Sequence, residues 1–333
     1  MNDSQNQQRS GKRLHPAAVV LLDLLLAGVI LLIFFFFQLL LPAMQVTQQP
    51  PAPTPAPTPA EQTSPQPDGR TEWQKRFEEH FSPELISTEN SYKSPNVSIT
   101  VETVTEGEGS ERITYHVADI YIASPENFRT YTANNVLQYY SVQDAMEMDA
   151  ASGALIAISG DFYAYQKSGF LIRNGAVYSR EYTGCDICVM FEDGSVENYH
   201  RGEYDIDEIM SRGVSQVWNF GPSLLDEQGR ALPDYDVSTT LGFPNPRSAF
   251  GYYEPGHYCF VVVDGRQENY SKGMTIPQLA KVFEGLGCAS AYNLDGGGSA
   301  LMTFNHERYS QQSNGADRNL SDLLIIVETE GGK

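Results

Sequence analysis

The sequence predicts an α+β fold for residues 71–333, with a mixed, largely antiparallel sheet built from hairpins and a few packed helices. Short runs of alternating apolar and polar residues are separated by Gly-containing turns, which is typical of antiparallel strands. Asn174-Gly175 and Asp193-Gly194 are strong hairpin signals. A single strand–helix–strand pattern, over residues 257–295, predicts one parallel crossover. Many hairpins with one crossover indicate α+β rather than a doubly wound α/β fold.

Helices and strands are predicted along the whole of residues 71–333. A cap at Thr71 followed by Trp73, Phe77 and Phe81 predicts a short entry helix. Alternation then predicts a hairpin over 97–123, followed by a helix over 141–153 that ends at Gly153. Further strands are predicted in 154–165, in hairpins over 169–179 and 188–199, and in 257–265, 289–295, 299–304 and 321–328, with helices over 205–213 and 275–287.

The amino-terminal part of the chain differs in composition from the rest. Residues 17–41, "AAVVLLDLLLAGVILLIFFFFQLLL", are long and apolar enough to span a bilayer as a signal anchor. Arg9, Lys12 and Arg13 precede them, so residues 1–16 are expected to stay cytoplasmic. Residues 42–70 form a Pro/Thr-rich extended spacer. The sequence therefore predicts a single-pass protein of the cell membrane whose domain, residues 71–333, is extracytoplasmic.

The charge of the chain limits its partners. It carries 42 Asp and Glu against 22 Lys and Arg, a formal net charge of −20. This balance argues against nucleic acid as a partner, because phosphate backbones are bound by excess positive charge. Any anionic substrate must be held by a local group of arginines.

Polar side chains follow several apolar strands at points marked by glycine. Asp161 follows "ALIAISG", Asp264 and Arg266 follow "CFVVV", and Asp295 follows "AYNL"; Arg247 lies in "NPRSAFGYY". Each Asp-Gly pair can also be a simple turn, and each Arg a surface charge. A rigid strand aims the residue at its end, so carboxylates and arginines at such positions favour a common site.

The stretch "YNLDGGGSALM" places three glycines directly after Asp295. A turn is one explanation, because glycine reverses a chain at no steric cost. A tight turn needs fewer glycines, however. Gly296, Gly297 and Gly298 strip the backbone of side chains, and their N–H groups can form a concave anion site.

Several of these stretches together resemble the phosphodiester glycosidase family. They are "GDFY" 160–163, "NFGPSLL" 219–225, "NPRSAFGYY" 245–253, "HYCFVVVDGRQ" 257–267, "YSKGMTIPQLAKVFEGLGCASAYNLDGGGSALM" 270–302 and "RNLSDLLII" 318–326. The resemblance covers about residues 150–328. Ser159 stands where the family is expected to have Asn.

The resemblance implies hydrolysis at the anomeric carbon of a sugar whose aglycone is a phosphodiester, in a glycoconjugate or an envelope polymer. A phosphate is already a good leaving group, so one carboxylate and an arginine cradle can suffice. Asp295 and Asp161 are then the catalytic candidates. The expected substrate-binding residues are Arg247, Arg266, Asp264, Gly296, Gly297, Gly298 and Arg318. The alternative is a non-catalytic module that binds anionic envelope glycans.

No cofactor or metal site is expected from the sequence. Cys185 and Cys188 form one C-x-x-C pair, but Cys259 and Cys288 lie 29 residues apart and do not complete a zinc site. A disulfide between either pair, or buried free thiols, both remain compatible with the sequence.

Overall fold

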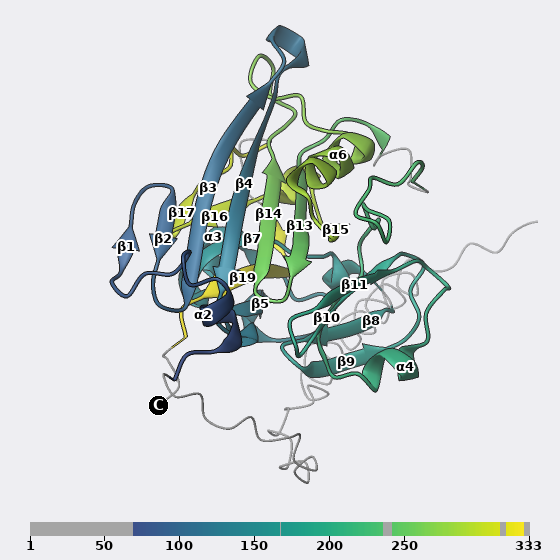
Figure 1. Cartoon of the computed structure of the whole chain (residues 1–333). Helices are drawn as coiled ribbons and strands as arrows, with labels where there is room; N and C mark the ends of the chain where they lie inside the picture. The colour runs from purple at the N-terminus through teal and green to yellow at the C-terminus, as the bar shows by residue number, and fades with distance from the viewer. Residues whose placement is uncertain (1–68, 167, 236–241, 314–317, 330–333) are drawn as a thin grey trace, which may run out of the picture. The chain divides into compact units, whose positions relative to one another are not determined.

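The computed structural model describes residues 69–166, 168–235, 242–313 and 318–329 (Figure 1). The predicted tail, the predicted anchor and nearly all of the predicted spacer lie outside these ranges. Within the described residues, no helix has the length and apolar character needed to cross a bilayer.

The largest sheet has seven strands in the order β1-β2-β3-β4-β14-β13-β15. Its centre is the predicted long hairpin of β3 and β4, which pair over their whole length from Val97–Ile122 to Glu106–Ile113. The strands are β1 (Ile86–Ser87), β2 (Ser91–Lys93), β3 (Val97–Glu106), β4 (Ile113–Ile122), β13 (Arg247–Glu254), β14 (His257–Val263) and β15 (Ser290–Asn293).

Two five-stranded sheets and one two-stranded ribbon complete the described strands. The first has the order β11-β10-β12-β8-β9, the second β17-β16-β7-β19-β5, and the ribbon pairs β18 with β6. Their bounds are β5 (Phe128–Thr132), β6 (Gln143–Asp144), β7 (Ala154–Ser159), β8 (Phe170–Arg173), β9 (Ala176–Arg180), β10 (Ile187–Phe191), β11 (Val196–Tyr199), β12 (Val214–Trp218), β16 (Met302–Phe304), β17 (Glu307–Arg308), β18 (Asn319–Leu320) and β19 (Asp322–Val327).

The helices of the described residues are short. They are α2 (Glu72–Arg76), α3 (Ala145–Ser152), α4 (Ile206–Met210) and α6 (Ile276–Leu286), with 3₁₀ turns η2 (Gly109–Glu111), η3 (Pro125–Asn127), η4 (Ala133–Asn135), η5 (Tyr163–Tyr165) and η6 (Gly297–Ser299). The predicted caps are confirmed: Thr71 closes a capping box on α2, and α3 ends at Gly153 in the left-handed conformation. The α+β class is likewise confirmed, with strands predominating.

The predicted crossover is present but differs from the expected form. Helix α6 joins β14 to β15, yet these two parallel strands are separated by β13, which pairs antiparallel with both. Consequently every strand pairing found in the described residues is antiparallel. The sequence pattern cannot show this insertion, because β13 precedes β14 in the chain.

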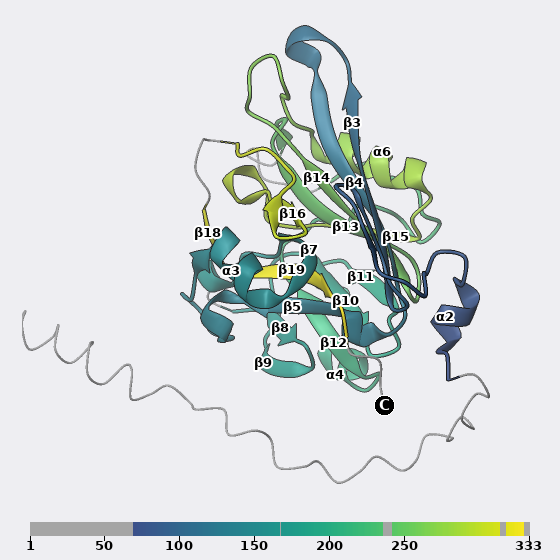
Figure 2. The same ribbon diagram turned by 90° about the vertical axis from the view of Figure 1, so that its left-hand side faces the viewer.

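The main core lies between the inner faces of the large sheet and of the β7-containing sheet. Phe250 and Phe260 from the large sheet join Ile158 and Leu324 from the other, and Trp218 from β12 packs against the same cluster. Helix α6 covers the opposite face of the large sheet (Figure 1), and α3 covers the outer face of β7 and β19 (Figure 2). Apolar residues on both faces explain the nearly continuous apolar runs of β7, β14 and β19.

A fully buried ion-pair network joins the two smaller sheets. Arg173, at the end of β8, donates through Nε to Asp322 at the start of β19 over 2.7 Å, and its Nη2 lies 2.7 Å from Asp161 Oδ2 after β7. The Asp161 amide also donates to Asp322 over 3.0 Å. Burial, together with the neighbouring Asp161 charge, raises the pKa of Asp322, while Arg173 opposes this. One guanidinium therefore pairs with two carboxyl groups that cannot reach solvent.

Replacing Arg173 tests this network. We expect Arg173→Met to lower the free energy of unfolding by about 3–5 kcal/mol, because it leaves two buried carboxylates without their cation. The measurement is urea unfolding at neutral pH. The matched control is Arg180→Met on the adjacent β9, whose ion pair with Asp207 is exposed and should contribute less than about 1 kcal/mol. Equal losses in the two variants would show that the buried network does not stabilise the fold.

Candidate active site

The Asp295–Gly298 segment follows β15, includes the first two residues of η6 and lies against the end of β7. The Asp295 amide donates to the Gly160 carbonyl over 2.9 Å, and the Ser159 hydroxyl donates to the Asp295 carbonyl over 2.9 Å. The second bond joins residues that are 136 positions apart in the sequence. The structure therefore brings the "GDFY" and "DGGG" stretches together, with Ser159 forming one of the links.

The Asp295 carboxyl is the one half-buried carboxyl group in this segment. Burial raises the pKa of Asp295 to about 6, and the negative charge of Asp161 acts in the same direction. A hydrogen bond with Ser299 and the positive charge of Arg318 act in the opposite direction. A carboxyl group with a pKa near neutrality exchanges protons readily under physiological conditions, which is the property required of a general acid or base.

Two exposed arginines lie directly on the glycine backbone. A Cβ atom on Gly297 would be 3.0 Å from Arg266 Nη2, and one on Gly298 would be 2.6 Å from Arg318 Nε. Neither arginine forms an ion pair with any described residue. Glycine at these positions thus allows each guanidinium to approach bare backbone beside Asp295, and the pair forms a positive surface in a strongly acidic chain.

The three glycines do not act alike, which corrects the expectation of three free amides. Gly297 has φ +61° and its N–H donates to the Pro246 carbonyl over 2.8 Å, so that amide is used within the fold. A Cβ on Gly296 would lie 2.6 Å from the same carbonyl oxygen. The amides of Gly296 and Gly298 make no hydrogen bond to another described residue. The segment is thus both a turn and a partly open backbone surface.

Arg247 lies below this surface rather than on it. It is buried at the start of β13, and donates to the carbonyls of Met274 and Phe243 over 2.9 Å and 2.8 Å. Burial lowers the pKa of Arg247 to about 10, and the neighbouring charge of Arg266 contributes. Its guanidinium adds positive charge to the site, and its hydrogen bonds attach the start of β13 to the segments that contain Phe243 and Met274. Arg266, in turn, is oriented by two hydrogen bonds to Asn245 Oδ1, of 3.2 Å and 2.9 Å.

Asp161 does not match the expectation of a second accessible carboxylate. Its side chain has no exposed surface. Oδ1 accepts from the Tyr163 amide over 2.9 Å, and Oδ2 accepts from the Asn219 amide over 3.0 Å beside Arg173. The sequence shows that Asp161 follows a strand, but it does not show that Arg173, from a different sheet, forms an ion pair with it. Asp161 lies next to the site as a fixed negative charge.

Asp264 also differs from its expected position. Both of its oxygens are occupied away from Arg266: Oδ2 contacts His116 Nε2 at 2.9 Å and accepts from Tyr270 over 2.8 Å, and Oδ1 accepts from the Gln311 amide over 2.9 Å. The side chain is buried. Asp264 therefore links β14 to β4 and to the loop after β17, and a direct role in binding substrate is not consistent with this placement.

The sequence interpretation missed two residues that determine the geometry of the site, Arg173 and Asp322. A charged residue at the edge of an apolar run is the available signal in "FLIRNG" and "SDLLII". Buried charges are rare unless they are paired, so such positions point to a network. Which charges pair, however, depends on the contact between sheets.

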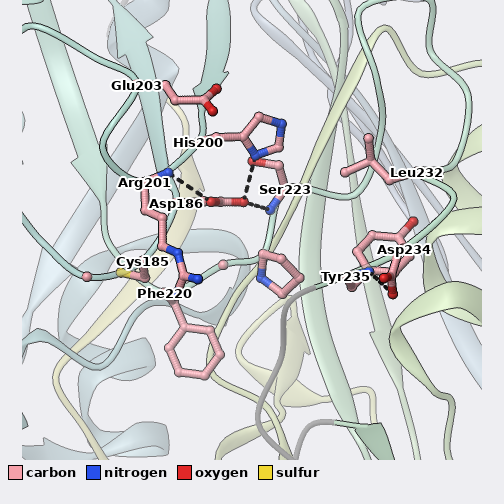
Figure 3. A pocket seen from close by; sticks show the side chains of 13 residues that line it. Cys185, Asp186, His200, Arg201, Glu203, Phe220, Ser223, Leu232, Asp234 and Tyr235 are labelled. Atoms are coloured by element: carbon pink, nitrogen blue, oxygen red, sulfur yellow. Dashed lines mark hydrogen bonds and ion pairs between the residues drawn. The ribbon is translucent and has the colours of Figure 1, made fainter.

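A pocket of about 410 Å³ is lined in part by the segment 220–223 (Figure 3). Asp186 is at its centre, accepting from the amides of Arg201 and Ser223 over 3.1 Å and 2.9 Å and lying 3.4 Å from His200 Nδ1. The Asn219 amide binds Asp161 at the other end of the same segment. The segment 219–223 is therefore held at its first residue by Asp161 and at its last residue by Asp186.

The cysteines form no disulfide in this structure. The Cys259 and Cys288 thiols lie 3.5 Å apart between β14 and the end of α6, and burial raises the pKa of Cys259. Burial likewise raises the pKa of Cys185 and of Cys188. Among the described residues, no three His, Cys, Asp or Glu side chains gather in a way that would hold a metal ion.

The fold and the site define a β-rich protein with a carboxyl group of raised pKa beside an arginine-lined glycine backbone. The phosphodiester glycosidase family model matches residues 152–327, more than half of the chain and all of the site. The chain belongs to the phosphodiester glycosidase family.

Two known proteins illustrate the relationship. The chain is 31% identical over 162 residues to the SPbeta prophage-derived uncharacterized protein YomE of Bacillus subtilis (strain 168), a match that covers 47% of this chain and 25% of that protein. The match thus spans about a quarter of the length of that relative. The catalytic domain of zebrafish N-acetylglucosamine-1-phosphodiester alpha-N-acetylglucosaminidase, auto-inhibited by its pro-peptide, superimposes with a TM-score of 0.58 at 20% identity, covering 74% of this chain and 87% of that one. This likeness supports the fold.

Gly298→Ala tests whether Arg318 binds anions. The added methyl group meets the Arg318 side chain and nothing else within 3.1 Å, so the exposed guanidinium should move aside while the fold is kept. Because hydrogen bonds to charged groups contribute about 1.5–3 kcal/mol, we expect affinity for inorganic phosphate to fall about tenfold or more. Isothermal titration measures this. Gly285→Ala, where a Cβ meets no atom within 4 Å, is the control. Unchanged phosphate binding in Gly298→Ala would remove Arg318 from the anion site.

Proposed function

We propose that this chain is a membrane-anchored, extracytoplasmic glycosidase that hydrolyses sugar-1-phosphodiester linkages in glycoconjugates or cell-envelope polymers. The observation that carries the proposal is the placement of Arg266 and Arg318 on bare glycine backbone, directly beside the half-buried Asp295. Family membership supports the reaction class. The name of the zebrafish relative supports a phosphodiester-linked sugar as the substrate.

The chemistry follows from the properties of the leaving group. Water supplies the oxygen that bonds to the anomeric carbon, the C1–O bond breaks, and a phosphate monoester leaves with the bonding electron pair. Such a leaving group needs little protonation, but its growing charge must be stabilised. Arg266 and Arg318 provide planar guanidinium groups suited to phosphate oxygens, and Arg247 adds positive charge from below. Binding that strengthens as charge develops lowers the barrier.

Asp295 acts in its ionised form in this scheme. As a nucleophile it would attack the anomeric carbon, and as a base it would take a proton from the attacking water; both roles require the carboxylate. The fixed charges of Asp161 and Arg318 tune it in opposite directions. Asp161 is a positioning residue, because its oxygens are bound to Tyr163, Asn219 and Arg173.

The reaction can be tested with purified protein and a set of sugar-1-phosphodiesters that differ in the sugar. In water labelled with ¹⁸O, the label should enter the sugar, because the C1–O bond breaks. Asp295→Asn should lower kcat/KM at least about a hundredfold, the usual scale for loss of a general acid or base. Since the pKa of Asp295 is raised to about 6, kcat/KM of the wild type should fall on acidification below pH 6.

The control and the contrary outcomes are specific. Asp193→Asn changes another Asp-Gly pair, in the β10–β11 turn, and should leave turnover unchanged. Label in the phosphate would identify a phosphodiesterase instead. A rate that falls above pH 6 would make Asp295 a general acid. Binding without turnover on every substrate, unaffected by Asp295→Asn, would favour the alternative of a non-catalytic glycan-binding module.

The proposed location rests on residues 17–41 and on the basic residues before them. Protease added to intact cells should remove the domain that begins near Thr71, while a tag fused before Met1 should stay protected. Deleting residues 1–41 should leave that domain in the soluble fraction. A domain that stays protected in intact cells and becomes accessible only after lysis would contradict the proposed topology.

A further inference from the structure

A surface of exposed aromatic side chains adjoins the candidate active site. It comprises the exposed Tyr140, Phe162, Tyr165 and Tyr178 together with the partly buried Tyr139, and is called the aromatic platform. Tyr140 and Tyr165 are the most exposed, at 74% and 51% of their surfaces. Exposed large aromatic residues that are contiguous, rather than scattered, commonly mark an interaction site.

Specific contacts link the residues of the platform. Phe162 stacks on Tyr165 with ring centroids 4.6 Å apart. The Tyr140 amide donates to the Ala164 carbonyl over 2.8 Å, which attaches the 139–140 segment to η5. Tyr139 and Tyr178 meet edge to face at 5.1 Å, so β9 contributes the far end.

The platform begins immediately beside Asp295. Phe162 follows Asp161, and the carbonyl of the preceding Gly160 accepts the Asp295 amide over 2.9 Å. One residue therefore separates the first platform ring from the backbone that positions the Asp295 carboxyl group.

Tyr140 carries backbone strain that packing does not explain. Its φ is +65°, a conformation that is unusual for a bulky side chain. The ring is mostly exposed, so the fold gains little from it. A strained residue whose side chain faces solvent is more readily explained by binding than by stability.

The chemistry of the platform selects its occupant. We propose that the aromatic platform binds pyranose rings of the substrate glycan beyond the cleaved linkage, so that the substrate is an oligosaccharide or polymer rather than an isolated sugar phosphodiester. A pyranose has an apolar face of C–H groups and a polar hydroxyl edge. Tyrosine offers a matching flat apolar face with a hydroxyl at its rim. The substrate identity in this inference rests on the proposed function, whereas glycan binding by the platform can be measured without it.

The experiment measures binding in the absence of turnover. The probes are phosphate-free tetrasaccharides of glucose, galactose and N-acetylglucosamine, titrated calorimetrically into the purified protein. We expect at least one to bind, and Tyr165→Ala to weaken that binding about tenfold. Tyr140→Asn should weaken it similarly without loss of thermal stability, because Asn tolerates a positive φ. Leu85→Ala, an exposed apolar residue before β1 at the edge of a different sheet, should change neither property.

Two results would overturn the inference: no binding of any tetrasaccharide by the wild type, or binding that both tyrosine variants retain. A wild-type dimer that Tyr140→Asn dissociates would assign the platform to self-association instead, and would also overturn it. Tyrosine-dependent glycan binding without hydrolysis of any phosphodiester would support the platform while removing the proposed function. Hydrolysis that depends on Asp295, together with unaltered glycan binding in the tyrosine variants, would do the reverse.

Discussion

The ion-pair network of Arg173 with Asp161 and Asp322 is the constraint on which the rest of the site depends. Asp322 begins β19, Asp161 follows β7 and Arg173 ends β8, so one cation fixes the ends of three strands from two sheets. A Cβ on Gly160 would lie 2.0 Å from the Asp322 carboxylate, which shows how closely these ends approach. The Gly160 carbonyl then sets the position of Asp295. A buried charge network of this kind is sensitive to the loss of any member, because each remaining charge would be left without a partner.

The electrostatics of the molecule explain why the site is built from backbone and arginines. The chain is strongly acidic overall, so an anionic substrate meets an unfavourable field over most of its surface. Arg247, Arg266 and Arg318 gather near one loop, and the glycines let two of the guanidinium groups approach closely. The local positive surface therefore lies next to a carboxyl group, that of Asp295, whose pKa is raised to about 6. The platform extends this site with uncharged contacts, which an acidic surface does not oppose.

The sequence predicts local structure well because turns and caps are local. Thr71, Gly153 and the Asn174-Gly175 turn were all interpretable from neighbouring residues. Strands β5 and β12 were not predicted, because "FRTYT" and "VSQVW" are short, mixed segments whose burial depends on the sheets they join. The gathering of Asp295 and Arg266 with the glycines followed from strand-end positions. The ion pair of Asp161 with Arg173 and the contact of Asp264 with His116 could not be predicted in this way, because each joins strands that are distant in the sequence.

The hydrogen bond from the Gly297 amide to the Pro246 carbonyl has a consequence for how a ligand is received. It ties the middle of the glycine segment to the residue before β13, while the Asp295 amide ties its start to the end of β7. The loop therefore has little conformational entropy left to lose when a ligand arrives, and it cannot reshape itself around a poorly fitting one. Glycines usually make a loop flexible, but here the loop is held rigid. A ligand is therefore selected by how well its shape fits the loop. Any adjustment on binding comes from the exposed side chains around it.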